Sequence, residues 1–259
     1  MIIDSHLHLS FNRAQHYAPH LKRTLHHMQM AGIDKTCLMP FPQFAGPIYP
    51  NQAEMTFQAE TLAEITEAHP GVFLPLLFIN PALPHAFTLE LMEKYMLRGP
   101  IIGAKFHISM IADDERYEPI YAFLEKHDIP VLFHSWYKTT ERTTFESTPA
   151  DVARMARKHP SLRILMAHMT GARLRGIQDI KRLPNVYLDT SGSQPEEGFL
   201  ERALEELGAD RVLYGSDYPI RAFSTQLARF DSVALSPEDR DKVLYRNALS
   251  FFRKGGRRS

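Results

Sequence analysis

Short apolar runs recur along this chain, separated by longer stretches in which apolar residues repeat at helical spacing. The runs are continuous rather than alternating, which is typical of parallel strands covered on both faces. They lie at residues 1–4, 36–40, 72–78, 101–106, 129–134, 162–168, 186–191 and 211–217. The amphipathic stretches predict helices over 52–69, 85–98, 115–128, 149–159 and 196–208.

Strands that alternate with helices favour parallel pairing, and eight such units in 259 residues fit a closed barrel better than an open sheet. We therefore predict an α/β fold of the (β/α)8 TIM-barrel type, with its functional site at the carboxyl ends of the strands. A Ser-Pro-Glu-Asp helix start at 236–239 predicts a last helix that closes the ring. We expect one domain over 1–253 and a flexible basic tail over 254–259.

Composition narrows the functions open to the chain. The formal net charge is zero, which gives no general attraction to nucleic acid or to an anionic membrane. No apolar stretch approaches the ~18 residues of a transmembrane helix, and the N-terminus lacks the features of a signal peptide. We therefore expect a cytoplasmic protein that binds neither nucleic acid nor membrane. The single cysteine, Cys37, lies in an apolar run and is expected to be inert core.

Metal-type ligands gather at the ends of five of the eight runs. His6 and His8 follow the first run with strand parity, so they are expected to share a face. The other runs end in Lys105 and His107, in His134, in His168 and in Asp217. Because the carboxyl ends of barrel strands form one rim, these side chains are expected to meet there.

Imidazole nitrogens and carboxylate oxygens favour a borderline divalent ion, Zn²⁺ first, with Mn²⁺ or Fe²⁺ as alternatives. Such an ion would activate water at neutral pH, and Asp217 is the candidate that takes the water proton. Asp4 either supports the ring of a ligand histidine or holds a turn at the strand end. For Asp189 we favour a role in positioning the rim.

Four further residues are candidates for substrate binding: His107, Trp136, Arg173 and Arg221. Each has an ordinary alternative. His107 could be a solvated loop histidine, Trp136 could simply cover surface, and the two arginines could form surface ion pairs instead of clamping a carboxylate.

The motifs in their order resemble the amidohydrolase superfamily, and within it the amidohydrolase-2 group. This group includes aminocarboxymuconate-semialdehyde decarboxylase, resorcylate-type decarboxylases and lactone hydrolases. The resemblance covers almost the whole chain and is carried by DSHLHLS (4–10), GAKFH (103–107), LFHS (132–135), LMAHMTG (165–171), NVYLDTS (185–191), LYGSDYP (213–219) and RNALSFF (246–252).

The resemblance implies that His6, His8, His134 and Asp217 bind one metal ion, while His168 contacts the attacking water or the substrate. In two-metal members, a carboxylated strand-four lysine bridges the ions, and histidines of strands five and six hold the second one. Lys105, His134 and His168 occupy those positions. The alternative is that Lys105 stays uncarboxylated and binds a substrate anion. One ion or two therefore remains open.

Three functions follow from this pattern. The leading hypothesis is hydrolysis of an amide, ester or lactone of a small, carboxylate-bearing substrate by metal-activated water. The alternative is metal-dependent, non-oxidative decarboxylation of an aromatic or muconate-type acid. The third is a non-catalytic barrel that binds a metal or small ligand. A homodimer is an option that the sequence leaves open, and the rim loops that would set specificity carry no readable motif.

Overall fold

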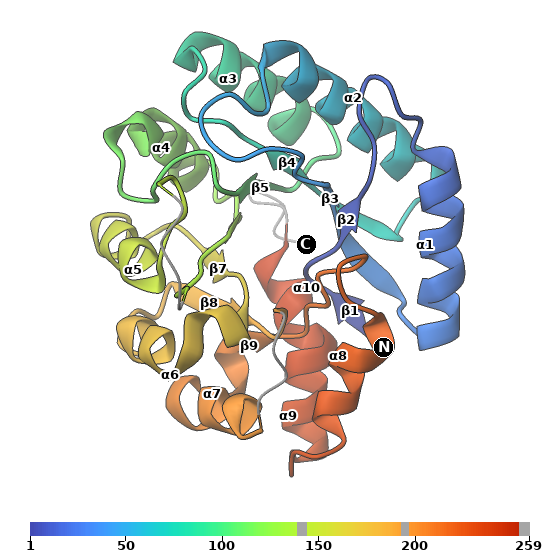
Figure 1. The fold of residues 1–259 in the computed structure, drawn as a ribbon, viewed down its shortest axis with the longest axis vertical. Coiled ribbons are helices and arrows are strands. Elements are labelled where there is room, and N and C mark those ends of the chain that lie inside the picture. Colours follow the sequence, from blue (N-terminus) through green and yellow to red (C-terminus); the bar gives the residue numbers. More distant parts are fainter. Residues whose placement is uncertain (139–143, 193–196, 254–259) are drawn as a thin grey trace.

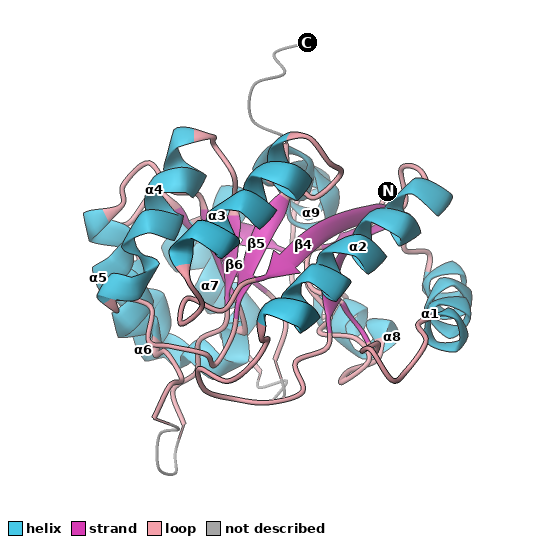
Figure 2. Cartoon of the chain, turned by 90° about the horizontal axis from the view of Figure 1, so that it is seen from above, coloured by secondary structure: helices cyan, strands magenta, loops and turns pink. Residues whose placement is uncertain are grey.

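Parallel strands form a barrel that is surrounded by a ring of helices (Figures 1 and 2). The computed structural model describes residues 1–138, 144–192 and 197–253. The strands are β1 (Ile3–Asp4), β2 (His8–Leu9), β3 (Lys35–Pro40), β4 (Phe73–Phe78), β5 (Gly103–Phe106), β6 (Val131–Phe133), β7 (Ile164–Met166), β8 (Val186–Asp189) and β9 (Val212–Leu213).

The helices lie between and after these strands. The α-helices are α1 (Ala18–Ala31), α2 (Gln52–Ala68), α3 (His85–Met92), α4 (Glu118–Lys126), α5 (Pro149–Lys158), α6 (Met169–Ile180), α7 (Phe199–Leu207), α8 (Phe223–Leu227), α9 (Pro237–Asp241) and α10 (Asn247–Phe251). Single turns of 3₁₀ or π helix extend several of them: η1 (Glu93–Leu97), η2 (Glu115–Tyr117), η3 (Ala209–Arg211), η4 (Ala228–Phe230) and η5 (Lys242–Arg246).

Each strand pairs in parallel with the next, in the order β1-β3-β4-β5-β6-β7-β8-β9. The ring closes where the first strand region meets the chain after β9. There the Ser5 amide donates to the Tyr214 carbonyl (2.9 Å), and Leu7 forms a parallel bridge with Tyr218. The predicted TIM barrel is confirmed, and each of the eight apolar runs contains a strand.

The first strand differs from the prediction. It is divided into β1 and β2, both paired with β3, and His6 lies in the interval between them. In this interval Ser5 bonds to Tyr214, and the His6 carbonyl accepts from the Asp217 amide (2.7 Å). These bonds to the chain after β9 replace the ladder to β3, so simple strand alternation does not describe His6 and His8.

Two apolar layers hold the barrel together. One fills its interior with residues such as Ile3, Leu132 and Leu213, and includes Cys37, which is fully buried as predicted. The C-terminal helix α10 joins this layer, and Phe251 packs on Tyr187 near the start of β8 (ring centroids 5.0 Å apart). α10 therefore covers the amino end of the barrel and leaves the carboxyl end for the site.

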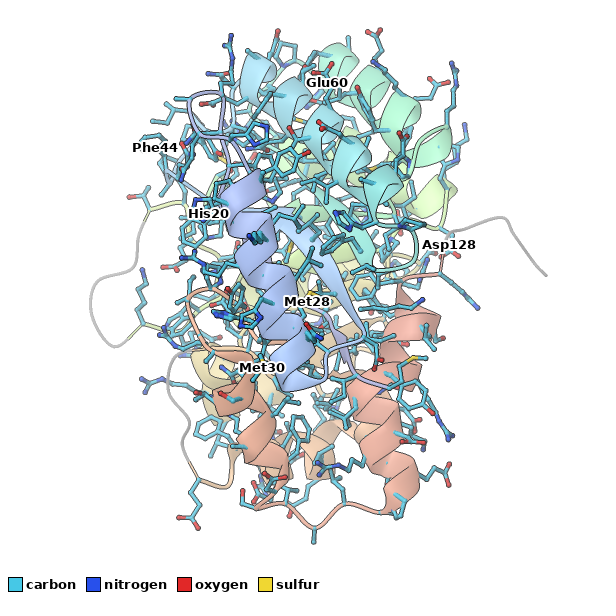
Figure 3. All side chains as sticks on the ribbon, turned by 90° about the vertical axis from the view of Figure 1, so that its right-hand side faces the viewer. His20, Met28, Met30, Phe44, Glu60 and Asp128 are labelled. Carbon is cyan, nitrogen blue, oxygen red and sulfur yellow. The ribbon has the colours of Figure 1, made fainter. Side chains whose placement is uncertain are left out.

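The second apolar layer lies between the strands and the outer helices. α1 shows the burial pattern of an outer helix: Met28 is 3% exposed and Met30 is 75% exposed (Figure 3). The five predicted helices are all present, and the predicted start at Pro237 is that of α9. The stretch predicted over 85–98 is divided into α3 and η1, and that over 115–128 into η2 and α4. Residue 196, the predicted start of the helix that contains α7, lies outside the described residues. In the described part of the chain, no helix is long and apolar enough to cross a bilayer.

Gly103 opens β5, two residues before Lys105, at a point where the backbone has no room for a side chain. A Cβ added there would lie 2.6 Å from Leu76 Cδ2 and 2.9 Å from the Pro130 carbonyl oxygen. We expect Gly103→Ala to destabilise the fold by about 1–3 kcal/mol, because the packed barrel cannot yield without strain. Thermal unfolding measures this, and an unchanged melting temperature would contradict the packing described.

Candidate metal centre

His6, His8 and Asp217 bring three ligand atoms together at the carboxyl end of the barrel. The two Nε2 atoms are 3.2 Å apart, and Asp217 Oδ1 lies 3.5 Å from each of them. All three side chains are buried. His6 comes from the first strand region, and Asp217 from the turn after β9, where its left-handed backbone (φ 63°) directs the chain across the rim.

The other nitrogen of each ring decides where its proton lies. His6 Nδ1 faces Asp189 Oδ2 at 2.7 Å, and His8 Nδ1 faces the Pro40 carbonyl at 3.1 Å. Both partners are acceptors, so each Nδ1 carries the proton and each Nε2 presents a lone pair. Two lone pairs and a carboxylate oxygen therefore face one another, an arrangement that a shared cation would stabilise.

The electrostatics of the three groups also suit a cation. Burial, followed by the charge of Lys105, holds the pKa of His6 well below its usual value and lowers that of His8 to about 3, so both rings are neutral. Burial raises the pKa of Asp217 to about 7 against the opposing charge of Lys105. Asp217 Oδ1 has no hydrogen-bond partner among the described residues. A divalent ion would offset the burial of this carboxylate, so the residues fit the predicted metal.

Lys105 extends from β5 into the same space. It is 1% exposed, and its Nζ lies 3.4 Å from His6 Nε2. Burial lowers the pKa of this ammonium to about 8, although the charges of Asp217 and Asp189 oppose the shift. A buried cation beside a candidate metal centre can attract the anionic part of a substrate.

Asp189 and Asp4 both support the site, each through different contacts. Asp189, at the end of β8, accepts from His6 Nδ1 and from the His168 amide, so it orients the ring of a candidate ligand. Asp4 instead accepts from the Ser216 amide (2.8 Å) and hydroxyl (2.7 Å). Of the two roles considered for Asp4, the structure shows the one that holds a turn.

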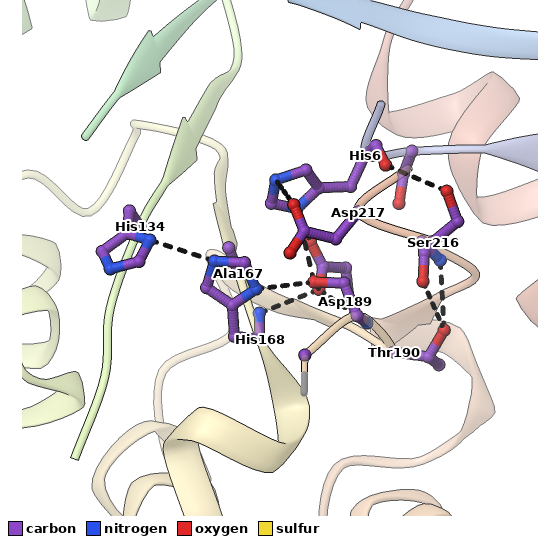
Figure 4. A network of polar contacts seen from close by, with 12 residues as sticks. His6, His134, Ala167, His168, Asp189, Thr190, Ser216 and Asp217 are labelled. Atoms are coloured by element: carbon purple, nitrogen blue, oxygen red, sulfur yellow. Dashed lines mark hydrogen bonds and ion pairs between the residues drawn. The ribbon is translucent and has the colours of Figure 1, made fainter. Parts of the chain in front are cut away.

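His134 and His168 face each other across the rim (Figure 4), with His134 Nδ1 3.0 Å from His168 Nε2. His168 precedes α6, and its Nδ1 lies 2.9 Å from Ser191 Oγ. His6, His168 and Asp189 also have ligand-type atoms within 4.8 Å of one another. Since Asp189 is already held by hydrogen bonds there, we favour His6, His8 and Asp217 as the metal group.

Glu146 is a site residue that sequence reasoning missed. It is buried in the segment between β6 and α5, with Oε1 2.9 Å from His134 Nε2. It follows His134 by 12 residues and belongs to no motif, so no local sequence signal indicates the contact.

Two aromatic candidates lie beside these histidines. The His107 ring packs on the rings of His134 (centroids 4.7 Å apart) and Phe78 (5.8 Å). It is therefore a half-buried residue of the rim. Trp136 lies 5.3 Å from the His168 ring and rests on Gly171, where an added Cβ would come within 2.5 Å of the indole. Both positions are compatible with substrate contact, which stays a prediction.

The two candidate arginine clamps differ in position. The Arg221 amide donates to the Asp217 carbonyl (3.3 Å), and the Arg221 charge opposes the rise that burial causes in the pKa of Asp217, so Arg221 belongs to the surroundings of the site. Arg173 lies within α6 at a non-helical, left-handed point (φ 57°). The substrate role of Arg173 stays a prediction.

The fold and the rim together define a TIM-barrel enzyme with a candidate metal centre at the carboxyl ends of its strands. The chain belongs to the Amidohydrolase family, whose sequence model matches residues 3–254. The family resemblance drawn from the motifs is thereby confirmed.

Two known proteins with similar sequences are gamma-resorcylate decarboxylases. The chain is 27% identical to gamma-resorcylate decarboxylase from Polaromonas sp. over 37% of its length, and 24% identical to that from Rhodococcus jostii over 54%. The matches span 36% and 55% of those relatives.

Solved structures share the fold over nearly the whole chain. 5-Carboxyvanillate decarboxylase from Sphingomonas paucimobilis gives a TM-score of 0.77 at 16% identity and covers 98% of this chain and 99% of its own. Dihydroxybenzoic acid decarboxylase from Polaromonas sp., with bound manganese and the inhibitor 2-nitroresorcinol, gives 0.75 at 18% identity, covering 97% and 96%.

Proposed function

We propose that this protein is a metal-dependent, non-oxidative decarboxylase of a small aromatic acid that carries a hydroxyl group beside its carboxylate. The observation that carries the proposal is the convergence of His6, His8 and Asp217 on one point beside the buried ammonium of Lys105. The relatives, which are resorcylate-type decarboxylases, favour this reaction over the hydrolysis that led among the sequence hypotheses.

The reaction replaces the bond between a ring carbon and the carboxylate by a C–H bond, releases CO₂ and consumes one proton. His6, His8 and Asp217 would hold the metal ion, and His134 is the further ligand that the family resemblance suggests. When bound, the ion supplies positive charge for the oxygens of the substrate. Lys105 supplies a second positive charge, and His168 and Asp217 are the groups placed to deliver the proton.

The identity of the ion is part of the proposal. The nitrogen and oxygen donors suit Zn²⁺, Mn²⁺ and Fe²⁺ alike, so the ligands do not choose among them. The manganese bound by the dihydroxybenzoic acid decarboxylase makes Mn²⁺ as strong a candidate as the Zn²⁺ expected from the sequence.

The test is decarboxylation of 2,6-dihydroxybenzoate by protein loaded with Mn²⁺ or Zn²⁺. We expect equimolar CO₂ and resorcinol, and loss of this activity when the metal is removed by a chelator. A matched panel of aryl esters and lactones checks for hydrolysis. Metal-dependent ester or lactone cleavage without CO₂ from any hydroxybenzoate would overturn the proposal and restore the hydrolase hypothesis.

A further inference from the structure

Glu146 places a buried carboxylate against a histidine of the rim. It lies on the segment that leaves β6 after His134, and it is 2% exposed. Its Oε1 contacts His134 Nε2 at 2.9 Å, and its Oε2 pairs with Lys138 Nζ at 2.7 Å. Burial of a carboxylate costs free energy unless the group is paired. The contact of Glu146 with His134 is therefore an integral part of the site.

The two partners of Glu146 fix its role in this contact. Oε2 forms an ion pair with the Lys138 ammonium at 2.7 Å, and Oε1 lies 2.9 Å from a ring nitrogen of His134. A carboxylate paired with an ammonium accepts hydrogen bonds and donates none. The proton between the two side chains must lie on His134 Nε2.

The contact with Glu146 assigns a ring proton of His134 to Nε2, which donates to Glu146 Oε1 at 2.9 Å. A neutral ring with Nε2 protonated has a lone pair on Nδ1. Nδ1 is the nitrogen that faces His168 Nε2 at 3.0 Å, on the inner side of the rim.

We propose that Glu146 is the positioning residue of His134, which fixes the tautomer and the ring direction so that an unprotonated Nδ1 faces the interior of the site. The inference rests on the proposed function, in which His134 serves the metal centre. A histidine held in this way is ready to bind a metal ion, and carboxylate partners of ligand histidines commonly raise metal affinity.

A purely structural role would be to fasten the loop between β6 and α5 through Lys138. The two roles predict different results, because a loop fastener affects stability but not the proton on His134. Another pair offers a matched control: His159 Nδ1 contacts Glu125 Oε2 at 3.0 Å, away from the candidate metal group.

The first experiment compares Glu146→Ala, Glu146→Gln and Glu125→Ala for Mn²⁺ affinity, by competition with a chelating dye, and for thermal unfolding. We expect Glu146→Ala to bind Mn²⁺ about 10–100-fold more weakly. Glu146→Gln keeps an acceptor oxygen and should lose about fivefold or less. Glu125→Ala should bind as the wild type does. Wild-type affinity in folded Glu146→Ala would overturn the proposal.

A second readout needs no metal at all. In metal-free protein with ¹⁵N-labelled histidine, the His134 signals, identified by their loss in His134→Asn, should report a protonated Nε2 and a bare Nδ1. Glu146→Gln should preserve this pattern, and Glu146→Ala should shift it towards the other tautomer. An unchanged His134 spectrum in Glu146→Ala contradicts the inference.

The two proposals can fail separately. Wild-type protein that binds Mn²⁺ but decarboxylates no hydroxybenzoate refutes the proposed function, while the tautomer and affinity differences still stand. Wild-type protein that decarboxylates, with Glu146→Ala equal to it in affinity and in spectrum, refutes the inference alone.

Discussion

Asp217→Asn is expected to lower turnover by ~10² or more while the fold remains intact. The substitution removes the one negative charge of the His6, His8 and Asp217 group, in which Oδ1 lies 3.5 Å from both Nε2 atoms. An amide is a far weaker ligand for a divalent ion, and it cannot accept and return a proton. Metal content and kcat/KM are therefore expected to fall together.

The fold should survive this change for two reasons. Asp217 lies on the rim and not in the packed layers of the barrel, and asparagine tolerates the left-handed backbone that Asp217 adopts (φ 63°). Asp210→Asn, at a side chain that is 75% exposed, is the matched control and should leave both properties unchanged. A large drop in melting temperature with retained activity would mean that Asp217 is structural.

The barrel could be predicted from the sequence because its strands are buried on both faces. Each continuous apolar run, such as 72–78 or 162–168, contains a strand, and the alternation with amphipathic stretches leaves few other folds. The division of the first strand could not be predicted. It depends on hydrogen bonds that link Ser5 and His6 to residues more than 200 positions away, and no local sequence pattern predicts such bonds.

From the sequence, only those residues of the candidate site that lie at strand ends could be predicted. His6, His8 and Asp217 meet because the barrel aligns the carboxyl ends of its strands, and Lys105 joins them from β5. The supports of these residues were not predictable. The choice between Asp4 and Asp189 depends on which carboxylate faces a ring, and both lie at strand ends with the same local chemistry.

Glu146 shows a second limit. Its contact with His134 joins two residues 12 positions apart that belong to no common motif, and such a contact has no periodic pattern in the sequence. The same holds for Trp136, whose place beside His168 depends on the missing side chain of Gly171. The sequence therefore identifies the side chains that lie at strand ends on the rim. The contacts that orient these side chains can be identified only from the structure.

Lys105→Met is expected to lower kcat/KM for 2,6-dihydroxybenzoate by about 10²–10³, with metal content close to that of the wild type. Methionine keeps the length and apolar stem of the side chain but removes the buried charge 3.4 Å from His6 Nε2. Removal of the buried Lys105 charge leaves the substrate carboxylate without a counterion. The substitution therefore weakens both substrate binding and the reaction.

Metal content decides between the two roles that the sequence left open for Lys105. An uncarboxylated lysine can be replaced without loss of metal, and its removal can raise the melting temperature, because burying an ammonium group costs free energy. A carboxylated lysine would bridge two ions, so Lys105→Met would then lower the metal content from near two ions per chain to near one. Elemental analysis of both proteins, purified without added metal, separates these cases: equal content with lost activity makes Lys105 the cation that binds the substrate, and a halved content makes it a ligand of a two-metal centre.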